Sequence, residues 1–175
     1  MSLIFIKRAT LRDLPTIMAI INHAKAQLKA AESPQWQDGY PDAAALRRDV
    51  DAQQCWLLVV DGQVAGTATM VIGDDPNYRH IEDGQWQNSQ DPYATIHRIA
   101  IGAGFGGQHL SHYFFSNLIS QAYHEGVRNF RMDTHVKNQQ MQAIARSFGY
   151  KHRGTIYVDE QTRDASRLAF ELNLD

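Results

Sequence analysis

The sequence predicts an α+β domain in which helices form layers on both faces of a mixed, mostly antiparallel sheet of about seven strands. Three observations predict this fold class. Two strand-like runs joined by Asp61 and Gly62 indicate an antiparallel hairpin, because this dipeptide favours a tight turn. A strand, a glycine-rich turn and a helix between residues 93 and 125, followed by a strand at 127–136, indicate a right-handed crossover between parallel strands. Two further strand-like runs close the chain as an antiparallel pair.

The composition is that of one ordinary domain. A chain of 175 residues can bury a sizeable core, and we expect a single domain over residues 1–175. Its 17 basic and 19 acidic residues leave a net charge of −2, which gives no reason to expect nucleic acid or an anionic membrane as a partner. No apolar run is long enough for a signal peptide or a membrane span, so we expect a cytoplasmic protein. The lone cysteine, Cys55, lacks the partners for a disulfide or a zinc site, and we expect no metal.

The first elements are a strand and two helices. Residues 3–9 alternate as a strand does, and Thr10 with Asp13 three positions later predicts a capping box that opens a helix. An apolar stripe at helical spacing continues this helix to about Lys29. An irregular loop rich in Pro, Gly and Asp follows, and then a short helix over about 42–51.

The middle of the chain is predicted to be β-structure. The hairpin strands are residues 55–60 and 63–72. Residues 73–92 are polar and rich in turn formers, with a short strand predicted around 78–81. Residues 93–101 are almost continuously apolar, which predicts a buried central strand.

The last third of the chain completes the sheet. The helix after the glycines spans about 107–125 and carries an apolar stripe every fourth residue, so it lies against the sheet. The strand at 127–136 precedes a short helix that ends at Gly149, a residue type favoured at helix C-termini. The closing strands are 151–158 and 166–173, with a turn at 159–164 between them.

The glycine turn has two readings. Gly102, Gly104 and Gly107 form a G-x-G-x-x-G between a strand and a helix, the context of a dinucleotide-binding fingerprint. This reading is weak, because the turn comes late in the chain, only one parallel crossover is present, and Glu125 or Asp133 would have to hold the ribose. In the other reading, backbone N–H groups at the helix N-terminus bind the pyrophosphate of a different ligand.

The order of elements resembles the GCN5-related N-acetyltransferase (GNAT) family over nearly the full chain. Residues 97–119, HRIAIGAGFGGQHLSHYFFSNLI, are similar to the family's central strand, pyrophosphate loop and following helix. Residues 132–158, MDTHVKNQQMQAIARSFGYKHRGTIYV, are similar to its closing segment. The resemblance implies the acyl-CoA N-acyltransferase fold, with about four helices and a central parallel pair, at 96–101 and 130–136, that splays apart.

The resemblance also implies a co-substrate, acetyl-CoA, whose pantetheine arm lies between the splayed strands. A backbone N–H near Ile99 would stabilise the oxyanion of the tetrahedral intermediate. The residues implied in coenzyme binding are Ile99, Ala100, Ile101, Gly106, Gly107, Gln108, His109, Leu110, Ser111 and Asn138.

The pyrophosphate loop departs from the family pattern. Gly106 stands where the family has arginine or glutamine, and His109 and Ser111 stand where it has glycines. We expect the missing positive side chain to weaken coenzyme binding by about 1–3 kcal/mol. We also expect His109 to adopt ordinary helical angles, because it carries a Cβ.

The reaction implied by the family is direct attack of an amine on the thioester, which needs a base. His97 matches the position of a histidine base in some relatives, and Glu82 is the rival candidate. The family's general-acid tyrosine falls at Ala145, so we consider Tyr150 or Tyr157 as the acid, or water, since a thiolate is a weak base.

The acceptor side is expected to be built from loop aromatics and the central strand. A cationic amine is attracted to aromatic faces and to a carboxylate. The candidates for substrate binding are Trp36, Tyr40, Trp86 and Thr95.

These observations predict an acetyl-CoA-dependent N-acetyltransferase that acts on a primary amine of a small molecule or peptide. Relatives often form dimers, so the resemblance also implies a homodimer. Two other classes stay open: a catalytically weak acyl-CoA-binding or regulatory module, indicated by the altered loop and by Ala145, and a nucleotide-dependent oxidoreductase, indicated by the glycine spacing.

Overall fold

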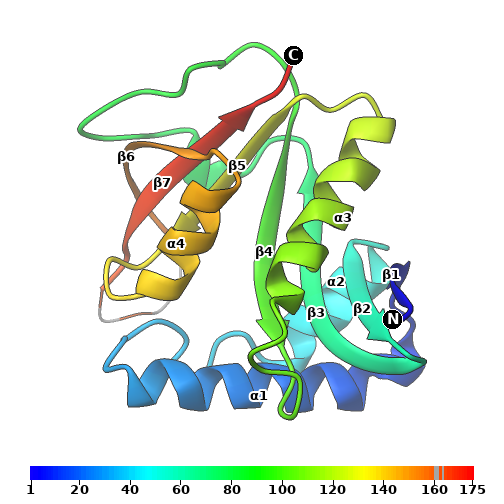
Figure 1. Cartoon of the computed structure of the whole chain (residues 1–175). Helices are drawn as coiled ribbons and strands as arrows, with labels where there is room; N and C mark the ends of the chain where they lie inside the picture. The colour runs from blue at the N-terminus through cyan, green and yellow to red at the C-terminus, as the bar shows by residue number, and fades with distance from the viewer. Residues whose placement is uncertain (160–161, 163) are drawn as a thin grey trace.

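The computed structural model describes residues 1–159, 162 and 164–175 of the chain. Within them lies a seven-stranded sheet in the order β1-β2-β3-β4-β5-β7-β6 (Figure 1). The strands are β1 (Ile4–Arg8), β2 (Cys55–Val60), β3 (Gln63–Ile72), β4 (Tyr93–Ile101), β5 (Asn129–Thr134), β6 (Lys151–Tyr157) and β7 (Ser166–Asn173). The α-helices are α1 (Leu14–Ala30), α2 (Ala43–Asp51), α3 (Leu110–His124) and α4 (Gln139–Ser147), and short 3-10 turns lie at Leu11–Asp13 and Pro76–Tyr78.

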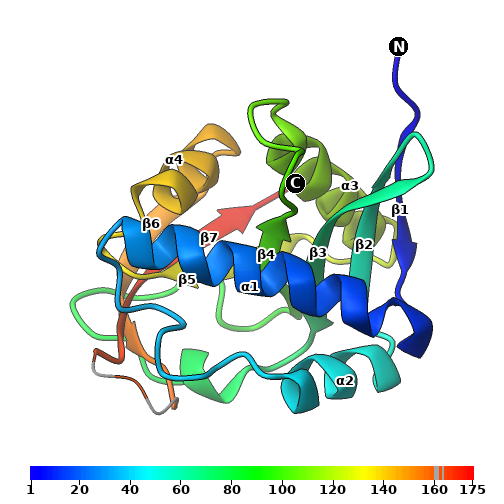
Figure 2. The ribbon, with the colours of Figure 1, turned by 90° about the horizontal axis from the view of Figure 1, so that it is seen from below.

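The helices lie on both faces of the sheet, as predicted. Apolar residues of α3 and α4 pack on one face, and those of α1 and α2 pack on the other. Viewed from below, α3 and α4 lie on one side of the sheet, α2 and the segment 73–92 lie on the opposite side, and α1 runs across the end of the central strands (Figure 2). No helix in the described chain is long and apolar enough to cross a bilayer.

The structure confirms two local predictions from the first half of the chain, the tight turn of the hairpin and the capping box. Asp61 and Gly62 both have positive φ, 48° and 83°, as a two-residue I′ turn requires. Thr10 and Asp13 form the predicted capping box. The box opens a single 3-10 turn, and α1 itself begins one residue later, at Leu14.

The central parallel pair separates early. β4 and β5 pair in register only at Tyr93, Ala94 and Thr95, although β4 continues to Ile101. Beyond Thr95 the two strands diverge, so the backbone groups on their facing edges no longer bond to each other. This splay, implied by the family resemblance, opens the space that the site occupies.

The segment 73–92 differs from its prediction. The strand expected at residues 78–81 is absent; instead Pro76–Tyr78 form a 3-10 turn, and the Asp75 carboxylate caps it by accepting a hydrogen bond from the Asn77 N–H. Pro76 favours this turn because its ring fixes φ and it has no N–H to donate to a strand.

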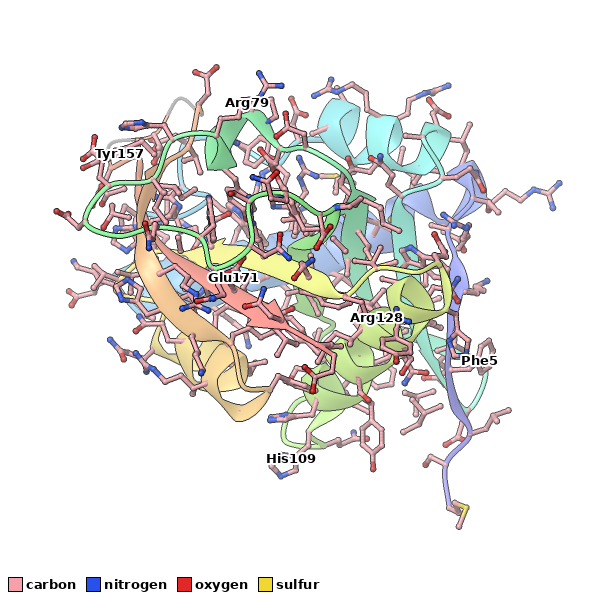
Figure 3. The ribbon with its side chains drawn as sticks, turned by 90° about the horizontal axis from the view of Figure 1, so that it is seen from above. Phe5, Arg79, His109, Arg128, Tyr157 and Glu171 are labelled. Atoms are coloured by element: carbon pink, nitrogen blue, oxygen red, sulfur yellow. The ribbon has the colours of Figure 1, made fainter. Side chains whose placement is uncertain are left out.

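Two buried charged residues of the sheet hold the same segment. The Glu171 carboxylate accepts hydrogen bonds from the backbone N–H groups of Gln87, at 2.7 Å, and Asn88, at 3.3 Å. The Arg131 guanidinium lies 4.1 Å from the ring centre of Trp86. Figure 3 shows Glu171 on β7 next to this segment. The segment is therefore placed by residues that lie more than 40 positions away in sequence.

The closing elements form as predicted, but their order in the sheet differs from their order along the chain. Gly149 has φ +84° just after α4, as a helix-terminating glycine does. β7 inserts between β5 and β6, so the chain ends in the interior of the sheet. The turn predicted at 159–164 lies partly outside the described residues. Cys55 is buried in the core, and burial raises the pKa of its thiol to about 11.

Candidate active site

A cleft of about 1160 Å³ opens where β4 and β5 separate. Its walls are the second half of β4, the glycine loop, the first turns of α3 and α4, the second half of α1, and the loop after α1. In Figure 1 these elements surround the space between α3 and α4, with α1 across its lower end. The cleft therefore brings together segments from both halves of the chain.

The glycine loop leaves its backbone open to the cleft. A Cβ built on Gly104, Gly106 or Gly107 would meet no other atom within 4 Å. Gly104 and Gly107 have φ of +84° and +74°, a conformation that glycine adopts without steric cost. Among the described residues, no side chain caps the N-terminus of α3. The His112 N–H bonds the His109 carbonyl oxygen at 3.0 Å, which leaves the N–H groups of Leu110 and Ser111 and the positive end of the helix dipole available to an anion in the cleft.

The conformation of His109 corrects the sequence-based expectation. Its φ is +54° and its ψ is 23°, which is left-handed rather than helical, and α3 begins at Leu110 instead of near Gly107. The family places glycine at this position, and the left-handed conformation is the one that favours glycine. The backbone thus keeps the shape expected for glycine although the side chain is imidazole.

Replacing His109 with glycine is expected to stabilise the protein. A non-glycine residue in the left-handed region destabilises the folded state by about 1–2 kcal/mol, and glycine removes this strain. Glycine also gives the unfolded chain more conformational entropy, which offsets part of the gain, so we expect the free energy of unfolding to rise by about 0.5–1 kcal/mol. Urea unfolding of His109→Gly against wild type measures it. Ser111→Gly, at a helical position of the same segment, is the matched control and should lose stability. Equal losses in both variants would contradict the argument.

Asn138 stands at the opposite wall of the cleft, as the N-cap of α4. Its side-chain oxygen accepts a hydrogen bond from the Met141 N–H at 3.1 Å, and its amide nitrogen lies 3.4 Å from the Gln35 side-chain oxygen. The N-termini of two helices, α3 and α4, therefore border the same space.

His97 lies in the cleft with an acidic partner. Its Nε2 is 2.9 Å from Oδ2 of Asp75, while Oδ1 of that carboxylate accepts the Asn77 N–H at 2.9 Å. Burial alone would raise the pKa of Asp75, but the hydrogen bonds from His97 and Asn77 hold that pKa below its ordinary value. Within the described part of the chain, Nδ1 of His97 has no hydrogen-bond partner. An ionised Asp75 accepts Nε2–H, which leaves the lone pair of a neutral imidazole on Nδ1.

The lowered pKa of Asp75 predicts how the stability of the protein depends on pH. The pKa of Asp75 in the folded state lies below its unfolded value of about 3.9. The contribution of the Asp75 carboxylate to the free energy of unfolding is therefore fully present above about pH 3.9, and it is lost as the pH falls through the folded-state pKa. Asp75→Asn is therefore expected to lose about 1 kcal/mol at pH 7 and progressively less below pH 4. Urea unfolding across this range measures the difference. A gap between the two proteins that does not change with pH would contradict it.

Most of the residues that the sequence predicts for the site line this cleft. They include His97 from β4 and the loop aromatics Trp36 and Tyr40. The implied coenzyme-binding residues also line it: Ile99, Ala100, Ile101, Gly106, Gly107, Gln108, His109, Leu110, Ser111 and Asn138.

Two candidates from loops and outer strands lie outside the cleft wall. Glu82 forms a backbone bridge with Thr155, and its carboxylate lies 3.3 Å from Nε2 of His80. Tyr157 lies on the outer strand β6, on the far side of the molecule from His109 (Figure 3).

Three further candidates pack into the body of the protein. Trp86 stacks on Arg131 and donates its indole N–H to the Tyr78 carbonyl oxygen at 2.9 Å. Thr95 is fully buried. Tyr150 is buried as well, and burial raises the pKa of its phenol.

Sequence reasoning missed two residues that the structure places at the site, Asp75 and Arg98. Asp75 precedes Pro76 in a short Asx turn, which is a recognisable local pattern, but nothing local links it to His97. Arg98 belongs to a β-strand in sequence and gave no sign of its conformation.

The comparisons with known proteins agree with this geometry. Residues 19–150 match the family model of the acetyltransferase (GNAT) family. No curated protein sequence matches the chain significantly. A GNAT-family acetyltransferase structure from Streptococcus agalactiae is 32% identical, with a TM-score of 0.87 over 98% of this chain and 96% of that one.

Two ligand-bound structures share the fold at lower identity. An acetyltransferase from Salmonella typhimurium solved with acetyl-CoA is 18% identical, with a TM-score of 0.67 over 98% of this chain and 94% of its own. A ribosomal L7/L12 α-N-protein acetyltransferase in complex with coenzyme A is 17% identical, with a TM-score of 0.70 over the same shares. The family model and the streptococcal structure together show that the chain belongs to the GNAT family of acetyltransferases.

Proposed function

We propose that the protein is an acetyl-CoA-dependent N-acetyltransferase that acetylates a primary amine of a small molecule or peptide by direct attack in a ternary complex. The observation that carries this proposal is the end of β4–β5 pairing at Thr95, beside a cleft that reaches an uncapped helix N-terminus. That arrangement suits a long ligand with an amide-bearing arm and a pyrophosphate. The two neighbours solved with acetyl-CoA and coenzyme A share this fold.

In this proposal the coenzyme arm lies along the free edge of β4. Backbone groups of Ile99 and Ile101 pair with its amides as an added strand would. The pyrophosphate binds at residues 106–111, where the open glycine backbone and the first turn of α3 supply N–H donors. Asn138 contacts the coenzyme from the N-terminus of α4.

His97 is the proposed general base. The amine nitrogen attacks the thioester carbonyl carbon, and its proton passes to Nδ1 of His97, whose other nitrogen is held by Asp75. The tetrahedral oxyanion is stabilised by a backbone N–H near Ile99. Collapse breaks the C–S bond and releases the coenzyme thiolate, which takes a proton from water, because Ala145 replaces the family's tyrosine.

The acceptor amine is proposed to enter beside the loop that follows α1. Trp36 and Tyr40 come from this loop and line the cleft together with His97. Their aromatic faces suit a cationic amine. This assignment leaves Trp86, Thr95, Glu82 and Tyr150 without direct contact to the reacting atoms.

A ligand screen followed by an activity screen tests the proposal. Thermal stability is measured with acetyl-CoA, coenzyme A and NAD, and thiol release from acetyl-CoA is then followed across a panel of polyamines, amino acids, antibiotics and short peptides. Stabilisation by both coenzymes and amine-dependent thiol release are expected. Stabilisation by NAD alone would overturn the proposal.

A non-catalytic acyl-CoA-binding module is the second candidate, because Ala145 removes the family's acid. Tight acetyl-CoA binding without thiol release for any amine of the panel would favour it. The two candidates are thus separated by the activity screen rather than by the binding screen.

A further inference from the structure

β4 contains a bulge where it lines the cleft. Thr67 of β3 pairs with Ala100 and Thr69 pairs with His97, so the single residue between the threonines lies opposite two residues, Arg98 and Ile99. A bulge of this kind releases backbone hydrogen-bonding groups from the ladder and turns the strand locally. Because the bulged residues line the cleft, the released groups belong to its wall.

The bulge requires an unusual backbone conformation at Arg98. Its φ is +52°, in the left-handed region that a side chain with a Cβ rarely adopts. Such a conformation costs about 1–3 kcal/mol and persists only where surrounding contacts enforce it. The Arg98 side chain makes several contacts that can do so.

The Arg98 guanidinium joins three other segments. Nη1 lies 2.8 Å from Oδ2 of Asp49 on α2, and Nε donates to the Tyr40 hydroxyl at 2.8 Å, with Nη2 also contacting that hydroxyl. The same oxygen of Asp49 accepts a hydrogen bond from the hydroxyl group of Thr69 on β3, at 2.8 Å. Loop, helix and both strands of the bulge therefore meet at one charged group.

This group is largely shielded from water. The side chain of Arg98 is 18% exposed and that of Asp49 is 11% exposed. Removing one member of such a pair leaves the other charge buried without a partner, which is strongly unfavourable. The N–H donors of the guanidinium lie in one plane, so its hydrogen bonds also fix the orientation of the Arg98 side chain.

We propose that Arg98 is a positioning residue that holds the β4 bulge so that its released backbone groups face the thioester carbonyl. The inference rests on the proposed function, since it assigns the oxyanion site to the geometry that Arg98 enforces. The Tyr40 hydroxyl also links the loop after α1, on the acceptor side, to the Arg98 guanidinium. The conformation of this loop and the geometry of the oxyanion site are therefore coupled. Arg98 does not itself contact the reacting atoms.

The test is the carbonyl stretching band of bound acetyl-CoA, labelled with carbon-13 at the carbonyl and recorded by difference infrared spectroscopy. A hydrogen bond from the bulge lowers this frequency relative to free acetyl-CoA. The variant Arg98→Lys keeps the charge and the Cβ but loses the planar fork, and Tyr40→Phe removes only one partner of the guanidinium. We expect the band to move back toward its free position in both variants, while the affinity for coenzyme A, which has no acetyl carbonyl, changes less than about twofold.

Arg128→Lys is the matched control. Arg128 stacks on Tyr123 at 3.5 Å, beyond the C-terminal end of α3 and away from the glycine loop, and this variant should keep the wild-type band (Figure 3). If Arg98→Lys does not fold, Tyr40→Phe decides, since it leaves the ion pair with Asp49 in place.

Failure of the inference differs from failure of the proposed function. A wild-type band at the free position, or a wild-type band in both variants, overturns the role of Arg98 while acetyl-CoA still binds. Absence of acetyl-CoA binding to the wild-type protein overturns the proposed function itself.

Discussion

Replacing His97 with alanine is expected to lower the turnover number by about 10²- to 10⁴-fold, the usual contribution of a general base. Without the imidazole, the attacking amine has to lose its proton to water. The loss should be smaller for weakly basic amines and at high pH, because more of the amine is then already neutral. Thiol release from acetyl-CoA, with an acceptor found in the amine panel, measures the effect.

The controls for this prediction separate chemistry from binding. His97→Ala should bind coenzyme A as the wild-type protein does, because the imidazole is assigned to the acceptor side. His124→Ala removes an exposed imidazole at the end of α3, outside the cleft, and should keep full activity. A His97→Ala protein with more than half of the wild-type turnover would show that another group, or solvent, removes the proton.

Replacing Gly106 with arginine is expected to tighten coenzyme binding by about 1–3 kcal/mol, or about 5- to 150-fold. The family carries arginine or glutamine at this position, and this chain carries none. The structure has room for the new side chain, because a Cβ at Gly106 meets nothing within 4 Å and its φ is not positive. Calorimetric titration with coenzyme A measures the gain, which should shrink at high salt as an ion pair with the pyrophosphate is screened.

Two further variants make the second prediction specific to charge. Gly106→Leu adds bulk without charge and should leave the affinity near that of wild type. Gly106→Glu places a carboxylate beside the pyrophosphate and should weaken binding by repulsion. Equal affinity for coenzyme A in the arginine and glutamate variants would show that the pyrophosphate does not lie at this loop.

Much of the fold could be predicted because its signals are local. The turn at Asp61 and Gly62, the capping box of Thr10 with Asp13, and the helix end at Gly149 each depend on residues within four positions of one another. The parallel pairing of β4 and β5 was predictable because a strand–helix–strand connection is almost always right-handed. The family resemblance added the expectation that these two strands splay apart.

The segment 73–92 could not be placed in the same way. Its course depends on buried partners far along the chain, Glu171 and Arg131, which accept and donate hydrogen bonds to its backbone. Trp86 therefore stacks on Arg131 rather than lining the cleft. A polar segment without periodicity carries no local signal for such partners.

The sequence by itself determined the order of the elements, the glycine loop and the histidine on the central strand, because turn chemistry and periodicity act over a few residues. Only the tertiary structure decided which side chains meet in the cleft: Asp75 reaches His97 across 22 residues, and Asp49 reaches Arg98 across 49. It also decided the left-handed backbone of Arg98 and His109, two residues whose side chains disfavour that conformation. A strained backbone needs contacts that outweigh the local preference; at Arg98 the largely buried ion pair with Asp49 is such a contact, and it exists only in the folded chain.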